Sequence, residues 1–413
     1  MEPRAPRPSL PGSVYILSAI TFMVAMGFGL IGPALPALAD MFGVGAAVAG
    51  LAVSGFALAR LITNVILAGV VGRWRLRTVL TAGLLIQAVF SVLAGLSPDF
   101  TLLILARLIS GAGSAAFTIA STALVILSVP DAVRGRATSV YFASSSAGIV
   151  AGPALGGFVT AIDPRFALIG YGLLLLIGGA AGWFALGSIA SLKATSGSDG
   201  RDEGDDPAQT SAASSPVGRA VLFQLLREPV FVAVLACQFA QGWVYYGMRV
   251  TTIPLFMAEI GLTAALIGTA LTVAAAVQIA SSLTAGPVSD RWNRQWPMLI
   301  GLGFGIAAMA LWGVESAPWA IVVGIFAYGV ASGANSALPP ALLGDLPKGG
   351  SGIAVSTFWI VFDIAAVLGP IVSGQLMDAW GYPAAFAGGV VVLLIAVAAV
   401  IRARPRPARP LTG

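Results

Sequence analysis

The stretch Gly148-Ile-Val-Ala-Gly152-Pro153-Ala-Leu-Gly156-Gly157 decides how this chain folds. Its glycines recur at a spacing of four residues, so on a helix they line one face. Its proline removes a backbone donor and bends the helix. Small residues on one face let two helix backbones approach closely inside a membrane. The stretch therefore predicts a bent helix that packs tightly against a neighbour within a bilayer.

The composition of the whole chain indicates an integral membrane protein. Of its 413 residues, 58% are hydrophobic and 9% are charged, and the mean hydropathy is +0.93. Soluble proteins have about 45–50% apolar and about 25% charged residues, so no soluble core would bury this much apolar surface. The apolar runs reach about 20 residues without two-residue alternation, which predicts spanning helices rather than barrel strands.

The residue types that the chain lacks exclude several classes of function. The single cysteine, Cys237, excludes an internal disulfide, and the absence of histidine removes the usual imidazole proton carrier and the common zinc sites. The sequence contains no nucleophile–base set and no metal-ligand cluster. We therefore expect a protein that is not an enzyme, that holds no metal or cofactor, and that binds no nucleic acid despite its net charge of +5.

Twelve apolar runs predict twelve membrane spans. They cover residues 13–38, 46–71, 78–96, 101–129, 137–161, 166–190, 229–258, 264–288, 296–314, 317–344, 352–377 and 383–401. Residues 191–228 differ in composition, because they are acidic and rich in Ser, Ala and Pro. We interpret them as a disordered linker between an N-terminal half, 1–190, and a C-terminal half, 229–413, that ends in a basic tail.

The basic residues predict the orientation of these spans. Of the 22 basic residues, all except Arg60, Arg107, Arg165 and Arg249 fall in the tails, the linker or the loops on one side. The positive-inside rule places that side in the cytoplasm. We therefore expect a multi-pass protein of the cell membrane (plasma or inner) with the linker and both termini in the cytoplasm.

The two halves repeat each other. At an offset of 217 residues, Gly152-Pro153 and Gly157 match Gly369-Pro370 and Gly374. Two parallel six-span halves are the arrangement in which a carrier binds its solute midway and rocks between two faces.

Three motifs resemble those of the major facilitator superfamily, and the resemblance covers nearly all of the chain outside the linker and tails. The opening stretch fits the fifth-span antiporter motif G-x-x-x-G-P-x-x-G-G at every fixed position, which is similar to the twelve-span drug:proton antiporters. Arg107 to Gly113 resembles the fourth-span motif R-x-x-x-G-x-G, whose arginine is associated with proton coupling, and Gly27 to Pro36 resembles the first-span pattern. The resemblance implies an all-α fold of two six-helix bundles around a cavity. It also implies a monomer that exports amphipathic drugs or natural products in exchange for protons.

A loop motif of the same family, G-x-L-x-D-R-x-G-R, occurs twice in altered forms. The second copy holds Gly286, Asp290, Arg291 and Arg294, whereas the first copy has Arg73 where the family has the aspartate. The resemblance implies that the second copy forms a cytoplasmic gate, in which the acid docks on the positive N-terminus of a facing helix. The other interpretation is an ordinary solvated turn whose arginines set topology.

Four charged residues lie inside predicted spans: Arg60, Arg107, Arg249 and Asp363. Charges in a membrane are expensive and usually functional. Asp363 is the one carboxylate near the middle of a span, so in a chain without histidine it is the candidate proton carrier. It either exchanges a proton during transport or forms a permanent pair with an arginine.

The three arginines leave more than one interpretation open. Arg107 either couples protons and contacts solute or anchors backbone carbonyls. Arg60 and Arg249 each bind an anionic group, pair with Asp363 or, for Arg249, snorkel outward. Three arginines against one acid also suggest an alternative function, a proton-coupled carrier of a specific small anionic solute. Further polar and aromatic side chains within spans either line a cavity or join helices, namely Gln238, Gln241, Tyr245, Tyr246, Gln278, Asn335 and Trp359.

Overall fold

The computed structural model describes residues 10–68, 75–185, 222–291, 295–344 and 351–403. Helices occupy all twelve predicted ranges within these residues, which confirms the predicted all-α fold. The first six are α1 (Gly12–Phe42), α2 (Ala46–Ala68), α3 (Leu76–Gly95), α4 (Phe100–Leu127), α5 (Asp131–Thr160) and α6 (Pro164–Ala185).

The remaining six ranges lie in the C-terminal half. Its first span divides into α9 (Pro229–Ala240), the π-helix η3 (Gln241–Met248) and α10 (Thr252–Glu259). It is followed by α11 (Ala264–Arg291), α12 (Gln295–Val314), α13 (Pro318–Gly344), α14 (Ser351–Trp380) and α15 (Tyr382–Arg402). By length and composition, eleven of the described helical stretches are suited to cross a membrane, and α6 contributes a shorter apolar segment, Pro164–Ala180.

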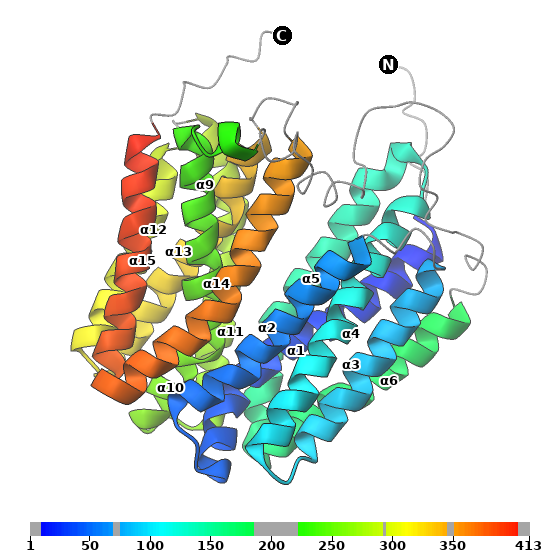
Figure 1. Ribbon diagram of the computed structural model, residues 1–413, viewed down its shortest axis with the longest axis horizontal. Helices are drawn as coiled ribbons and strands as arrows, with labels where there is room; N and C mark the ends of the chain where they lie inside the picture. Colours follow the sequence, from blue (N-terminus) through cyan, green and yellow to red (C-terminus); the bar gives the residue numbers. More distant parts are fainter. Residues whose placement is uncertain (1–9, 69–74, 186–221, 292–294, 345–350, 404–413) are drawn as a thin grey trace, which may run out of the picture.

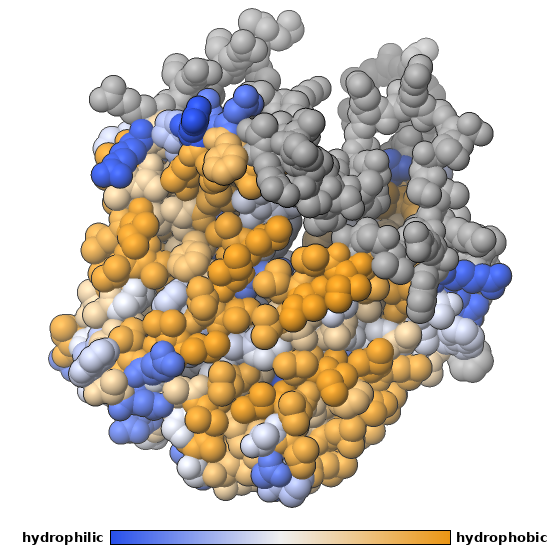
Figure 2. Space-filling model, viewed as in Figure 1, coloured by the Kyte–Doolittle hydropathy of each residue, from blue (hydrophilic) through white to orange (hydrophobic). Residues whose placement is uncertain are grey.

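The helices gather into two bundles, α1 to α6 and α9 to α15 (Figure 1). Each bundle has its own buried core, built around Leu17, Leu80 and Leu84 in the first and around Trp312 and Phe386 in the second. Apolar side chains also cover much of the outer face that Figure 2 shows. A water-soluble protein seldom exposes such a continuous apolar surface, whereas a lipid-facing one requires it. Most of the predicted linker, 191–228, lies outside the described residues.

The two bundles meet along two pairs of helices, α2 with α14 and α5 with α11. A third apolar cluster lies across this junction and joins Leu35, Leu38 and Val53 of the first half to Leu255 and Met377 of the second. These contacts lie towards the end of the bundles that is remote from the start of α1 and from the end of α15 (Figure 1). We call this remote end of the junction the far-end seam.

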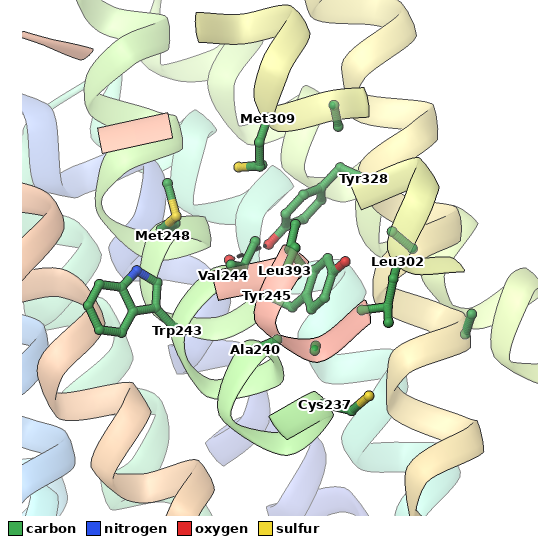
Figure 3. Close-up of a cluster of buried hydrophobic side chains, with 14 of the residues drawn as sticks. Cys237, Ala240, Trp243, Val244, Tyr245, Met248, Leu302, Met309, Tyr328 and Leu393 are labelled. Carbon is green, nitrogen blue, oxygen red and sulfur yellow. Dashed lines mark hydrogen bonds between the residues drawn. The ribbon is translucent and has the colours of Figure 1, made fainter. Parts of the chain in front are cut away.

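The π-helix η3 changes which side chains of its span face the core. Tyr245 lies among the buried residues of the C-terminal half, next to Tyr328, and the Tyr328 hydroxyl donates a hydrogen bond of 3.1 Å to the Val244 carbonyl (Figure 3). The next residue, Tyr246, contacts rings outside this core, at Phe28 and Phe362. Short π segments within α-helices are frequent at functional sites, because they rotate one part of a helix relative to the other.

Candidate functional site

The glycine face of α5 packs against the backbone of α1, as the opening stretch predicts. A β-carbon at Gly152 or Gly156 would collide with the α1 backbone at Met26 and Gly29 or at Leu30. Gly148 meets the same helix one turn earlier, at the Phe22 carbonyl. Only glycine permits this approach, so these three positions hold two helices of the N-terminal half together.

Gly157 and the carbonyl of Pro153 face the other half, while the Pro153 ring lies against Gly29 of α1. A β-carbon at Gly157 would lie 2.5 Å from the Ala264 carbonyl oxygen and 3.1 Å from the Gly268 Cα, both on α11. In return, Gly268 lies against the Pro153 carbonyl. The motif thus has two roles, because one face builds the N-terminal bundle while its last glycine contributes to the far-end seam.

The repeated stretch in α14 makes the corresponding contacts for the C-terminal half. Gly369 lies against Trp243 of η3 within its own half. A β-carbon at Gly374 would lie 2.6 Å from the Ala47 Cα of α2, and one at Gly50 would lie 2.6 Å from the Pro370 carbonyl oxygen. The predicted repeat therefore has a structural counterpart, since each half offers one glycine–proline helix to the far-end seam.

Asp363 lies on α14 where this helix passes α2 of the other half. The side-chain amide of Asn64 and the guanidinium of Arg60, both on α2, are the groups that stabilise its charge. Further along the same pair of helices, the Ser54 hydroxyl donates a hydrogen bond of 2.7 Å to the Val367 carbonyl. The carboxylate therefore bridges the two halves in the middle of the spans.

Arg60 has three kinds of partner. Its guanidinium donates a 3.4 Å hydrogen bond to the Ser114 hydroxyl, lies 5.2 Å from the centre of the Phe28 ring, and faces Asp363. Of the interpretations left open for Arg60, the structure places it beside the acid. Its guanidinium therefore interacts with side chains of its own half and with the carboxylate of the other half.

Aromatic rings connect the halves beside these charges. The ring centre of Phe28 on α1 lies 5.7 Å from that of Phe56 on α2 and 6.2 Å from that of Tyr246 on η3. The ring centres of Tyr246 and Phe362 of α14 are 5.6 Å apart. Trp359 extends the row, 6.0 Å from Phe362, and is 56% exposed. Edge-on contacts of this kind are typical of aromatic pairs. We call Phe28, Phe56, Tyr246, Phe362 and Trp359 the aromatic row.

Arg107 of α4 is 4% exposed, and its guanidinium carbon lies 4.5 Å from the centre of the Phe56 ring. Its Nε has no hydrogen-bond partner. Its ionisable neighbours among the described residues are the phenols of Tyr171 and Tyr246. The structure thus places Arg107 at one end of the aromatic row and brings it together with Arg60 and Asp363 around Tyr246.

Arg249 lies apart from this group. Its guanidinium donates a hydrogen bond of 2.8 Å to the amide oxygen of Gln278 on α11. The other terminal nitrogen, Nη2, is buried and has no hydrogen-bond partner among the described residues. Of the two arginines considered as partners of Asp363, Arg60 is the one whose charge acts on the carboxylate. Asn335 likewise joins helices, since its side-chain amide donates hydrogen bonds of 2.9 Å to the Cys237 carbonyl and of 3.0 Å to the Gln241 amide oxygen.

The predicted cytoplasmic gate falls at the edge of the described chain. Gly286 lies within α11, but the side chains of Asp290 and Arg291 and the whole of Arg294 lie outside the described residues, as does Arg73 of the first loop copy. In the part of the chain that is described, no group of three or more His, Cys, Asp or Glu side chains is placed to hold a metal ion.

A carboxylate at the opposite end of the spans was not predicted. Asp378, at the end of α14, accepts hydrogen bonds of 2.9 Å from both Ala46 N and Ala47 N, the first two backbone donors of α2. These donors have no partner within their own helix, and the positive helix end favours an acid. The sequence signal was present, because an aspartate near a span end can cap a helix, but nothing in the sequence names a partner in the other half.

Asn64 and the rings Phe28, Phe56 and Phe362 were also not predicted. An asparagine one helical turn after Arg60 within an apolar run was a readable signal for Asn64. The phenylalanines carried none, because a phenylalanine in a span is most often lipid-facing or core.

Comparisons with known proteins place the chain among transporters. The sequence description of the Major Facilitator Superfamily matches residues 17–258 and 239–413. Multidrug resistance protein 2 of Bacillus subtilis is 26% identical over 178 residues, 43% of this chain and 44% of that protein. The quinolone resistance protein NorA of Staphylococcus aureus is 24% identical over 152 residues, 37% of this chain and 39% of that protein. The chain thus spans less than half the length of these curated relatives.

Solved structures share the whole fold. An inward-facing, unoccupied bacterial homologue of the human lysosomal transporter Spinster superposes with a TM-score of 0.72 at 18% identity, over 97% of this chain and 100% of that one. The nucleoside transporter NupG superposes with a TM-score of 0.74 at 12% identity, over 96% of this chain and 100% of that one. At these identities the likeness concerns the fold alone, and it confirms two six-helix halves in the arrangement that the repeat predicts.

Proposed function

Because this chain belongs to the major facilitator superfamily, we propose that it is a secondary transporter that exports amphipathic drugs or natural products in exchange for protons. The observation that carries the proposal is the position of Asp363, a carboxylate in the middle of the spans whose charge is stabilised by Arg60 and Asn64 of the opposite half. The names of the curated relatives, which refer to multidrug and quinolone resistance, support the drug class over the part of the chain they match.

In this proposal Asp363 links proton binding to the movement of the halves. The ionised carboxylate is stabilised by the Asn64 amide and by the Arg60 charge, both on α2, and this attraction favours the closed junction of α14 with α2. A proton removes the charge and weakens both contacts, so the protonated form favours the conformation in which this junction has opened. A ligand, here a proton, shifts such an equilibrium by its different affinity for the two states.

The same proposal assigns places to the remaining parts. Gly157, Gly268, Gly374 and Gly50 form the surfaces that separate when the far-end seam opens. The loop copy with Gly286, Asp290, Arg291 and Arg294 is the corresponding gate at the other end. The chain acts as a monomer in the cell membrane with both termini in the cytoplasm, and it performs no catalysis.

The alternative is a carrier for one specific small anionic solute. Arg107 favours this alternative, because it is buried and has no acidic neighbour among the described residues. The aromatic row, which offers large apolar faces, favours an amphipathic solute. Uptake of small organic anions against amphipathic compounds, with the proton gradient in each direction, separates the two.

Proteoliposomes test the function directly. With the lumen one pH unit more acidic than the bath, one-for-one exchange is driven by about 1.4 kcal/mol, which accumulates a transported solute about tenfold. We expect accumulation from a panel of amphipathic compounds, together with a rise of the luminal pH when solute is added. Accumulation that follows the opposite gradient, or solute flux without proton movement, would contradict antiport.

Removing the far-end carboxylate should shift the balance between the two conformations. Asp378→Ala deprives α2 of a cap that contributes about 1 kcal/mol, so we expect the far-end seam to open about fivefold more often. Spin labels at Ile162 and Val314, exposed far-end residues of the two halves, report the distance in a Cys237→Ser background.

The matched control is Asp99→Ala. Asp99 also caps a helix, because its carboxylate accepts a hydrogen bond of 2.9 Å from Leu102 N, but both residues belong to the N-terminal half. This variant should leave the distance distribution unchanged. Equal shifts in both variants would show that Asp378 acts through general stability and not through the seam.

A further inference from the structure

Arg107 holds a positive charge that no acidic side chain among the described residues balances. The side chain is 4% exposed, its Nε makes no hydrogen bond, and the ionisable groups facing it within the described residues are two neutral phenols, Tyr171 and Tyr246. The Phe56 ring at 4.5 Å is its principal partner. Arg60, by comparison, bonds Ser114 and faces Asp363.

A buried guanidinium with so few partners is costly. Removing a charge from water costs far more than one ring contact returns, and buried cations are normally paired. The partners of Arg107 therefore offset only part of the cost. A planar carboxylate or a similar oxyanion would provide the missing acceptors, since the guanidinium fork donates two parallel hydrogen bonds to such a group.

The neighbourhood of Arg107 indicates what the anion is attached to. The Phe56 ring under Arg107 contacts Phe28, which contacts Tyr246, and Tyr246 contacts Phe362 of the other half. Rings in such a row offer faces and edges to a flat aromatic group. Their places on α1, α2, η3 and α14 put them at the mid-depth junction of the halves, beside Asp363.

We propose that the solute is a flat aromatic compound bearing one anionic group, which binds the Arg107 guanidinium while its rings lie along the aromatic row. The inference rests on the proposed transport function and narrows its substrate class. It also reconciles the two candidate functions, because an aromatic anion is amphipathic and anionic at once. A solute bound this way touches both halves, so its release accompanies their separation.

Equilibrium binding to the full chain in nanodiscs tests this without any proton gradient. The probes are 2-naphthoate and 2-naphthamide, which share their rings and differ in charge. We expect the wild type to bind the carboxylate about 10- to 100-fold more tightly than the amide, the gain typical of a hydrogen-bonded charge pair. Arg107→Gln should remove this preference, because it weakens carboxylate binding far more than amide binding, and Arg107→Lys should keep only part of it.

Arg165→Gln is the matched control, because Arg165 also lies over a phenylalanine ring, Phe42 at 5.8 Å, and also has a buried unpartnered Nε. It lies at the start of α6, outside the aromatic row, and should leave both affinities unchanged. Retained amide binding in Arg107→Gln shows that this variant is folded. If it is not, Arg107→Lys carries the comparison.

The outcomes separate the inference from the function on which it rests. Equal binding of the two probes by the wild type, or an unchanged preference in the Arg107 variants, overturns the inference even if proton-coupled flux of other compounds is found. Selective naphthoate binding in a chain that moves no protons supports the inference and leaves proton exchange as the part that fails.

Discussion

Replacing Asp363 by asparagine is expected to abolish proton-driven accumulation of solute. Asparagine has nearly the same shape and can still interact with the Asn64 amide, but it cannot bind or release a proton at neutral pH. With a gradient of one pH unit, the accumulation ratio should fall from about tenfold to about one. The measurement is luminal solute and luminal pH in proteoliposomes, wild type against variant.

Two further observations make this result specific. Downhill exchange of labelled for unlabelled solute should persist in Asp363→Asn, because that process needs the halves to move but not a net proton. Asp99→Asn, a change of an exposed acid within one half, should behave as wild type. The competing interpretation is a permanent pair of Asp363 with Arg60. It predicts unaltered proton coupling with lowered thermal stability, and that outcome would replace ours.

Adding a single methyl group at Gly157 should have the largest effect of any change at the far-end seam. The new carbon would lie 2.5 Å from the Ala264 carbonyl oxygen, so the backbones of α5 and α11 must part. Overpacking of this kind costs about 1–3 kcal/mol. Here the cost falls only on the conformation with the seam closed, which changes the ratio of the two conformations about 5- to 150-fold. We expect flux to fall by a similar factor, with normal membrane insertion.

Two other glycines of α5 separate this effect from general damage. Gly135→Ala adds its methyl group to open space, with no atom within 4 Å, and should be silent. Gly152→Ala collides with α1 inside the N-terminal half, so it should lower thermal stability and flux together, although insertion should remain intact. Flux and label distances in Gly157→Ala that match those of Gly135→Ala would contradict a role for Gly157 in the seam.

The sequence predicted the architecture because spans follow from hydropathy and need little knowledge of partners. The twelve helical ranges were readable from hydropathy, and the tight face of α5 and the equivalence of Pro153 with Pro370 were readable from residue spacing. The sequence also identified the four intramembrane charges, since each stands out in an apolar run. It did not assign their partners, because Arg60 and Arg249 were equally plausible beside Asp363.

The remaining features depend on geometry that a linear pattern does not carry. The π-helix η3 adds one residue to a turn, so the α-helical period misjudges which of Tyr245 and Tyr246 faces the core. Asp378 lies 331 or 332 residues from the backbone donors that it caps, so no local motif could join them. A repeat within one chain shows that two halves are alike but not which surfaces they present to each other.

The glycine composition of the seam also affects how fast the protein works. Glycine has no side-chain rotamers to lose, so bringing Gly157 against Gly268, or Gly374 against Ala47, carries almost no side-chain entropy cost in either direction. Interlocked leucines would hold the closed state more firmly, but they would have to disengage and reorder in every cycle. We therefore expect these backbone surfaces to part and rejoin with a lower activation barrier than interlocked side chains would impose.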